Sequence, residues 1–194
     1  MNERSAQSFR LILASGSPRR RELLTKMGYE FEIRIPDVDE HVPGPAREVV
    51  DILSRRKADA VAAQLNDGIV IASDTLVALN NEVLGKPANE ADAHRMLSEL
   101  SGNSHEVYTG VTLVDAANGR RMTRVVCTRV HFRALTDDEI RAYIRTGEPM
   151  DKAGAYAIQG GAHGFVSKFE GSYENVIGFP VSDIEAMLKE FTKE

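Results

Sequence analysis

The chain has 194 residues, of which 42% are apolar and 27% charged, and its formal net charge is -5. These values are typical of a soluble chain forming one sizeable domain, and the acidic balance argues against a general nucleic-acid or membrane-surface binder. The single cysteine, Cys127, excludes an intramolecular disulfide and fits a reducing compartment.

The first motif is "LILASGSPRRRELL", residues 11–24, in which a short apolar strand turns through small residues into three arginines. Ser17 is a typical N-cap and Pro18 a typical first helical residue. Cations are unfavourable at this end of a helix, because the backbone N–H groups and the helix dipole already make it positive. Arginines 19–21 would be favoured there if an anion docks, so the motif indicates a phosphate site or, alternatively, a solvated basic face.

Strand and helix patterns alternate along the rest of the chain, which predicts an α/β fold. The N-terminus has no apolar segment of the kind found in signal peptides, and Cys127 is expected to pack inside a strand. We expect one compact domain over residues 1–194, with 1–9 as a flexible N-terminus. The predicted elements are a strand in 29–36, a helix over 46–65, a buried strand over 68–79, a helix from Asn89 to Gly102, strands over 106–115 and 121–134, a helix from a Thr136–Glu139 capping box to Gly147, and a last helix after a Ser182–Glu185 capping box.

Two charged residues lie at positions that otherwise predict core. Lys57 shares one helical face with Val50, Leu53 and Val61, so it either extends its ammonium to solvent or faces an anion site. Asp74 interrupts the apolar run 69–79, and burying a carboxylate is costly unless it is paired, binds a metal or serves in catalysis.

Further charged residues lie in irregular segments and could join these two. A convergence of cations would suit a polyphosphate, and carboxylates beside them would suit a divalent metal. No P-loop, dinucleotide fingerprint, zinc motif or nucleophile elbow is present. The glycine-rich segment 147–166 is either a ligand-binding loop or a mobile surface loop. The cations are Arg19, Arg20, Lys57, Lys86 and Lys152, and the carboxylates are Glu40, Asp74 and Glu148.

Six segments carry a family resemblance: "LILASGSPRRRELL", "SRRKA", "ASDTLVALNNEVLGKP", "MLSELSGNSHEVYTGV", "GEPMDKAGAYAIQG" and "GSYENVIGFP". Together they resemble the Maf family of nucleoside triphosphate pyrophosphatases, from about residue 11 to 190. The resemblance implies an α/β fold with a long mixed sheet, flanked by helices, and two lobes around a cleft, as in the related inosine triphosphate pyrophosphatases. It implies a cytoplasmic enzyme that cleaves between the α- and β-phosphates with Mg²⁺ or Mn²⁺, and it suggests a homodimer. Neither nucleic acid nor a membrane is expected as a partner.

The resemblance also implies roles for individual residues. Asp74 is the expected proton acceptor, with Glu40 and Asp74 as metal partners. The positions that mark the branch acting on dTTP and UTP are matched by Arg19, Thr75 and Gln159, while Ala157 departs from the glycine of many members. The predicted phosphate contacts are Ser15, Ser17, Arg20, Lys57, Lys86 and Lys152.

The expected reaction is hydrolysis of dTTP and UTP to the nucleoside monophosphate and pyrophosphate. Clearance of modified pyrimidine nucleotides and a link to cell-division arrest are expected with it. The alternatives are the same reaction on 7-methyl-GTP or other modified nucleotides, and a nucleotide-binding regulator of cell division without turnover.

Overall fold

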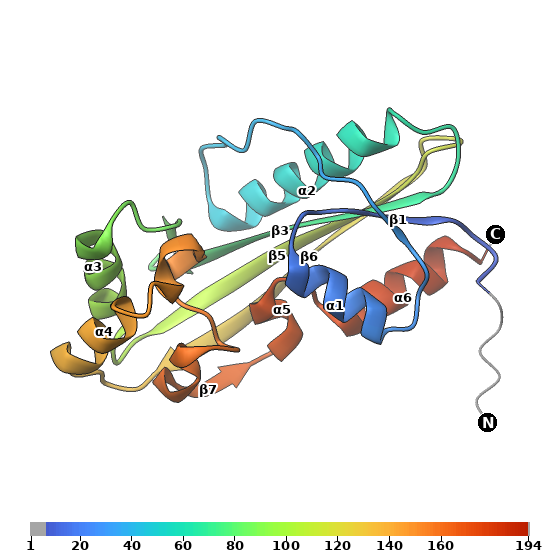
Figure 1. Ribbon diagram of the computed structural model, residues 1–194. Coiled ribbons are helices and arrows are strands. Elements are labelled where there is room, and N and C mark those ends of the chain that lie inside the picture. The colour runs from blue at the N-terminus through green and yellow to red at the C-terminus, as the bar shows by residue number, and fades with distance from the viewer. Residues whose placement is uncertain (1–6, 194) are drawn as a thin grey trace, which may run out of the picture.

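A computed structural model describes residues 7–193 (Figure 1). The predicted flexible N-terminus therefore lies mostly outside the described residues; within them, Gln7 donates a hydrogen bond to the carbonyl of Glu30. None of the helices in this part of the chain combines the length and apolar character needed to cross a membrane. The elements in chain order are β1 (Leu11–Ala14), α1 (Pro18–Lys26), β2 (Glu32–Ile33), α2 (Ala46–Ala62), β3 (Ile69–Leu79), β4 (Glu82–Leu84), α3 (Glu90–Leu100), β5 (Ser104–Asp115), β6 (Arg121–Phe132), α4 (Asp137–Ile144), the 3-10 turns η1 (Glu148–Asp151), η2 (Ala153–Ala155) and η3 (Gly161–Phe165), β7 (Val166–Glu170), α5 (Tyr173–Ile177) and α6 (Val181–Phe191).

The centre of the molecule is one mixed sheet in the order β2-β1-β3-β5-β6-β7, with β4 added to β3. Strands β2, β1 and β3 run parallel to one another, and all the other pairs are antiparallel. Helix α2 covers one face, α1 and α6 lie on the opposite face, and α3 and α4 lie at the far end of the long strands (Figure 1). The predicted α/β fold with a mixed sheet flanked by helices is confirmed, whereas the division into two lobes stays a prediction.

Strand β3 changes its neighbour along one edge. Residues Ile69–Ala72 pair with β1, and Val77–Leu79 pair with β4, while the other edge pairs continuously with β5. Between these two ladders, residues 73–76 have no strand partner on that edge within the described part of the chain. Asp74 and Thr75 therefore lie where the sheet opens.

The side chains of β3 alternate between the two faces of the sheet, as in any strand. Val70 and Ala72 pack in the core under α2, and Ile71 packs in the core formed with α1 and α6. The same alternation directs Asp74 toward α2 and Thr75 toward α1. The adjacent residues Asp74 and Thr75 thus face opposite sides of the sheet.

The helix signals of the sequence are largely confirmed. Ser17 caps α1 with Pro18 as its first residue, and Asn89 caps α3 by accepting a hydrogen bond from a backbone N–H. Thr136 and Glu139 form both halves of a capping box at α4. Several elements are shorter than predicted at their ends: α2 stops at residue 62, α4 at 144 and β6 at 132, and β2 covers only 32–33.

The predicted capping box at the last helix is wrong. Helix α6 begins at Val181 directly after Pro180, and no side chain caps it. Pro180 takes the N-cap position with an extended backbone, so the helix begins one residue before Ser182 and places that serine inside its first turn. A serine there cannot take the N-cap role predicted with Glu185.

The predicted packing of Cys127 is also wrong, because its side chain is exposed. Cys127 lies opposite Tyr108 in the β5–β6 ladder. Helix α2 packs mainly on β3 and β5, so this part of β6 is left uncovered. Alternation in the sequence identified the strand correctly but gave no information about which face a helix would cover.

Helix α2 lies unusually close to the sheet at Gly110. A Cβ atom built there would lie 2.6 Å from the carbonyl carbon of Val50 and 3.0 Å from Oγ of Ser54. The hydroxyl of Ser54 also hydrogen-bonds Thr112 on the neighbouring part of β5, at 2.9 Å. Glycine at position 110 therefore sets the spacing between α2 and the sheet, and with it the position of Lys57.

We expect Gly110→Ala to destabilise the protein by about 3 kcal/mol, because backbone atoms of α2 must move to admit the methyl group. Urea unfolding of the two proteins measures the difference. Gly164→Ala is the matched control, since a Cβ there meets nothing within 4 Å. An equal effect of the two substitutions would contradict the close approach.

His105 makes stability depend on pH. Its side chain is fully buried, and its Nε2 lies 2.8 Å from the hydroxyl of Tyr156. Burial, with a smaller effect of His131, lowers the pKa of His105 from 6.5 to about 4. The unfolded chain therefore takes up a proton that the folded protein does not, so stability falls as pH drops from about 6.5 toward 4.

At pH 5 this single group should make the protein about 2 kcal/mol less stable than at pH 7. His105→Gln keeps a hydrogen-bonding partner for Tyr156 but has no proton to gain. Unfolding curves at the two pH values should therefore show a smaller loss of stability in His105→Gln. The same loss in both proteins would assign the pH dependence to other groups.

Candidate active site

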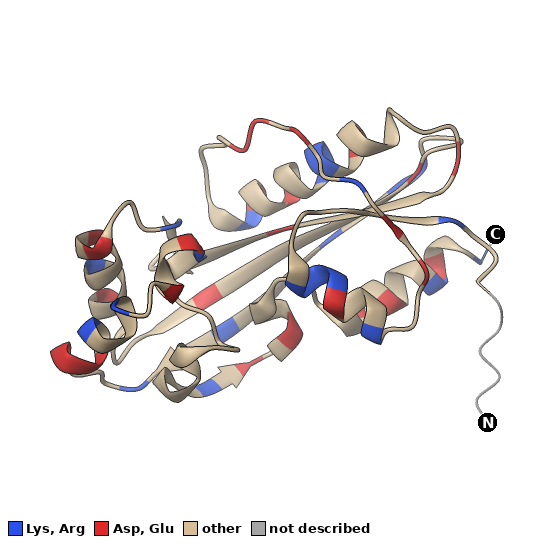
Figure 2. Cartoon of the chain, viewed as in Figure 1, with Lys and Arg blue, Asp and Glu red and all other residues tan. Residues whose placement is uncertain are grey.

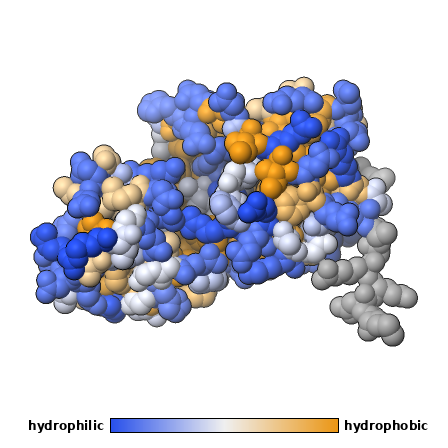
Figure 3. All heavy atoms as spheres, in the orientation of Figure 1, coloured by the Kyte–Doolittle hydropathy of each residue, from blue (hydrophilic) through white to orange (hydrophobic). Residues whose placement is uncertain are grey.

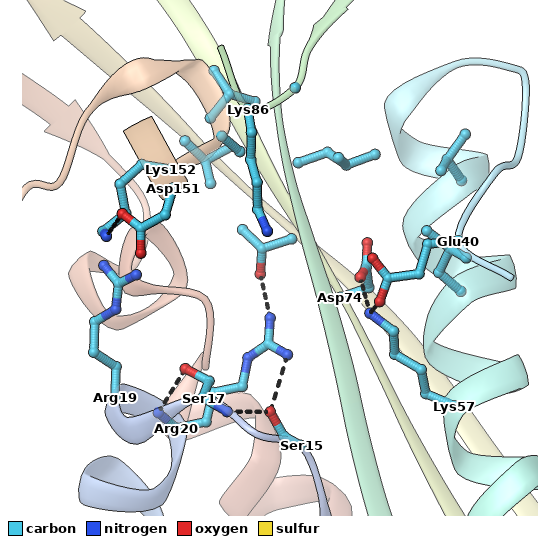
Figure 4. Close-up of a pocket in the computed structure, with 18 of the residues that line it drawn as sticks. Ser15, Ser17, Arg19, Arg20, Glu40, Lys57, Asp74, Lys86, Asp151 and Lys152 are labelled. Carbon is cyan, nitrogen blue, oxygen red and sulfur yellow. Dashed lines mark hydrogen bonds and ion pairs between the residues drawn. The ribbon is translucent and has the colours of Figure 1, made fainter. Parts of the chain in front are cut away.

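A cavity of about 860 Å³ opens at the gap in the edge of β3. Its walls come from the β1–α1 connection, the chain after β2, helix α2, strands β3 and β4 and the glycine-rich segment (Figure 4). All the predicted site residues line this cavity: Ser15, Ser17, Arg19, Arg20, Glu40, Lys57, Asp74, Thr75, Lys86, Lys152 and Gln159. Glu148 does not line it.

Lys57 joins the two predicted metal partners. Its Nζ lies 2.6 Å from Oδ1 of Asp74 and 2.8 Å from Oε1 of Glu40. Lys57 and Asp74 are both buried, with 8% and 7% of their surfaces exposed. The hydrogen bond from Lys57 lowers the pKa of Glu40, an effect that partial burial opposes. The lysine thus faces an acidic site inside the protein, and Asp74 has the partner that its burial requires.

Arg20 connects three separate segments of the chain. Its guanidinium donates to the carbonyl of Ser73 at 2.6 Å, to the carbonyl of Gly178 at 3.1 Å and to Oγ1 of Thr75 at 3.3 Å. A longer bond of 3.5 Å reaches Oγ of Ser15. Burial lowers the pKa of Arg20, and the charge of Asp74 opposes this shift. Most of the N–H donors of Arg20 thus bind protein oxygens, and they hold the residues on both sides of Asp74.

The other cations, Arg19, Lys86 and Lys152, line the same cavity. Figure 4 shows Lys86 extending into the cavity and Arg19 pointing toward Asp151 and Lys152. Lys152 forms an ion pair with Asp151. Five lysines and arginines line the cavity against three carboxylates, although the whole chain carries a net charge of -5. Figure 2 shows basic residues gathered at the start of α1, beside the middle of the sheet.

The predicted specificity residues lie at different depths. Thr75 hydrogen-bonds Oγ1 of Thr109 at 2.9 Å, in addition to Arg20, so it is fixed on the α1 side of the sheet. Gln159 is exposed at the cavity, and its side chain makes no hydrogen bond within the described residues. An amide in that position is available to a ligand.

Sequence reasoning missed the apolar part of the wall. Ile35, 74% exposed, and Val83, 38% exposed, both line the cavity, as does the buried Tyr156. Figure 3 shows a largely hydrophilic face with one gathering of apolar residues, over the region where β1 and the chain after β2 lie in Figure 1. The sequence predicted a strand in 29–36, whereas the strand covers only Glu32–Ile33 and leaves Ile35 at the cavity wall. No signal in the sequence marked this difference.

Comparison with known proteins identifies the family of this chain. The model of the family described as "Maf-like protein" matches residues 10–191. The chain belongs to the Maf family.

Three relatives cover nearly the whole chain, and each carries the name "dTTP/UTP pyrophosphatase". The protein from Pelotomaculum thermopropionicum is 50% identical over 184 residues, which is 93% of this chain and 96% of the relative. The one from Carboxydothermus hydrogenoformans is 50% identical over 183 residues, with 94% and 98% covered. The one from Vibrio cholerae serotype O1 is 48% identical over 186 residues, again with 94% and 98% covered.

Arg20→Lys should lower kcat/KM by about 10²-fold, because a lysine keeps the charge but cannot replace the planar set of donors that holds Ser73 and Thr75. The melting temperature should fall as well. Arg21→Lys is the matched control on the same helix, where the side chain is exposed. Full activity in Arg20→Lys would show that charge alone is needed at this position.

Proposed function

We propose that this protein hydrolyses dTTP and UTP between the α- and β-phosphates, releasing the nucleoside monophosphate and pyrophosphate. The observation that carries the proposal is a buried carboxylate, Asp74, fixed by Lys57 at the edge of a cavity lined with an excess of cations. Relatives named dTTP/UTP pyrophosphatase share about half of the residues over almost the full chain, which supports the same substrate pair here.

Asp74 is suited to accept a proton from an attacking water. One of its oxygens, Oδ1, accepts the hydrogen bond from Lys57, and the other oxygen makes none within the described residues. Lys57 therefore orients the carboxylate and balances its charge, while the second oxygen is left for water. A positioned general base of this kind typically contributes 10²–10⁴-fold to a rate.

The cations are suited to hold a triphosphate. Charge builds on the phosphate oxygens during attack at the α-phosphorus, and fixed positive groups stabilise it without reorganising. Lys86 extends into the cavity and has no ion pair within the described residues, which leaves its ammonium free for a phosphate. Ser17 and Arg19, at the start of α1, line the same space, where a helix start favours anions. Arg20 adds charge while it holds the backbone beside Asp74.

A divalent cation, Mg²⁺ or Mn²⁺, fits the carboxylates of this site. Glu40 and Asp74 approach one another closely enough to share the ammonium of Lys57. Residues 7–193 contain no cluster of three or more histidine, cysteine or acidic side chains that could hold a metal. Two carboxylates suffice for Mg²⁺ when phosphate oxygens and water complete its shell, and the ion then neutralises charge on the phosphates.

Base selection is assigned to Arg19, Thr75 and Gln159, the positions that mark the dTTP and UTP branch. We also keep as proposals a cytoplasmic location, a homodimer, the clearance of modified pyrimidine nucleotides and a link to cell-division arrest. Two alternatives remain testable: a preference for 7-methyl-GTP, and nucleotide binding without turnover.

The deciding experiment incubates the protein with a panel of nucleoside triphosphates and Mg²⁺ or Mn²⁺, and measures pyrophosphate and orthophosphate separately. We expect pyrophosphate from dTTP and UTP, none after chelation of the metal, and a loss of at least about 10²-fold in Asp74→Asn. The melting temperature and nucleotide binding of Asp74→Asn show whether that variant is folded.

Each other result has a defined meaning. Release of orthophosphate would place the cleavage at the γ-phosphate and refute the reaction. A preference for 7-methyl-GTP would refute the assignment of the three specificity residues. Tight nucleotide binding without turnover in the wild type would favour the alternative of a nucleotide-binding regulator of cell division.

A further inference from the structure

The backbone that carries Gln159 is held at both ends by side chains outside the cavity. Gln159 itself is exposed and makes no hydrogen bond within the described residues, so its place at the cavity depends on the backbone around it. That backbone, residues 157–161, follows η2 and runs into η3. Two residues of the α4–η1 region contact it directly.

The first is Tyr143 on α4, whose side chain is buried. Its hydroxyl oxygen accepts the backbone N–H of Ala157 at 3.0 Å. Burial, with a smaller effect of Glu148, raises the pKa of Tyr143. The hydroxyl of Tyr143 thus holds the residue that begins the turn.

The second is Glu148, the first residue of η1. Its Oε2 accepts the backbone N–H of Gly161 at 2.9 Å. Glu148 is half-buried and does not line the cavity, so its carboxylate is not one of the groups that face the ligand. It binds the far end of the same turn whose near end Tyr143 binds.

Two glycines allow the turn to lie this close to the side chains of Tyr143 and Glu148. A Cβ atom on Gly160 would lie 2.6 Å from Oε2 of Glu148 and closer still to Oε1, and one on Gly161 would lie 3.0 Å from the ring of Tyr143. The backbone on both sides of the peptide bond 160–161 therefore lies directly on the two side chains. Glycine is required here for close approach rather than for an unusual backbone angle.

We propose that Tyr143 and Glu148 are positioning residues that fix the turn 157–161 and thereby the place of Gln159 against the base of the nucleotide. The identity of that ligand, a pyrimidine nucleoside triphosphate, rests on the function proposed above. Uracil and thymine present a carbonyl oxygen where cytosine presents an amino group. An amide held in one place can favour one of these patterns, whereas an amide on a mobile turn adapts to both.

Tyr143→Phe keeps the ring and removes the hydroxyl. We expect KM for dTTP and UTP to rise about tenfold, kcat to change less than about threefold, and the preference for UTP over CTP to fall about tenfold, because an interaction with the base acts mainly on binding. The matched control is Tyr173→Phe, a tyrosine packed on the same core whose hydroxyl makes no hydrogen bond within the described residues.

Glu148 is tested in two steps. Glu148→Ala should reproduce the change in KM and in base preference, while Glu148→Gln should restore most of both, because its amide oxygen can still accept from Gly161. In the Gln159→Ala background, Tyr143→Phe should have little further effect on base preference, because the effects of substitutions at coupled residues do not add. Additive effects, or a lower melting temperature with KM and preference unchanged, would overturn the proposal.

Amide hydrogen exchange provides a readout that needs no activity. In Tyr143→Phe the amide of Ala157, and in Glu148→Ala the amide of Gly161, should exchange at least about tenfold faster than in the wild type. If the wild type hydrolyses none of the nucleotides, the proposed function fails while this measurement still decides the positioning role. Unchanged exchange at both amides would refute it.

Discussion

The arrangement of the site depends on one constraint, the exchange of partners along the edge of β3. Pairing of β3 with β1 ends at Ala72 and its pairing with β4 begins at Val77, so Asp74 lies in a stretch that has no strand partner on that edge within the described residues. The opposite edge stays paired with β5, which keeps this stretch straight and in place. The gap provides the space for a ligand, and the continuous ladder keeps the carboxylate from moving into it.

Both faces of β3 contribute to holding the gap open. On one face, α2 brings Lys57 to Asp74, and Gly110 lets the helix come close enough for that contact. On the other face, Arg20 binds the residues before and after Asp74. A buried ion pair contributes little net stability, because desolvation offsets the attraction between the charges. The pair is better explained by the chemistry of the cavity than by the folding of the chain.

The sequence predicted those features that depend on neighbouring residues. The cap at Ser17 and the capping box at Thr136 are local hydrogen-bonding patterns, and Lys57 and Asp74 were conspicuous because each interrupts an apolar pattern. Their pairing with one another could not be predicted, because it depends on how α2 crosses the sheet. The same holds for the partners of Arg20, and for the exposure of Cys127, which depends on how far the sheet is covered by α2, a helix that ends 65 residues earlier in the chain. The roles given to the site residues came from resemblance to a family, and the cavity now places these residues together.

The hydrogen bond from Arg20 to the carbonyl of Gly178 joins residues 158 positions apart. A chain is synthesised from its N-terminus, and the ribosome releases the C-terminal part last. Strands β1 to β6, Lys57 and Asp74 are all made well before Gly178, yet Arg20 cannot take its full set of partners until the connection between α5 and α6 has emerged. The cavity is therefore completed only near the end of synthesis, and a nascent chain that holds nearly all the site residues still lacks the finished site.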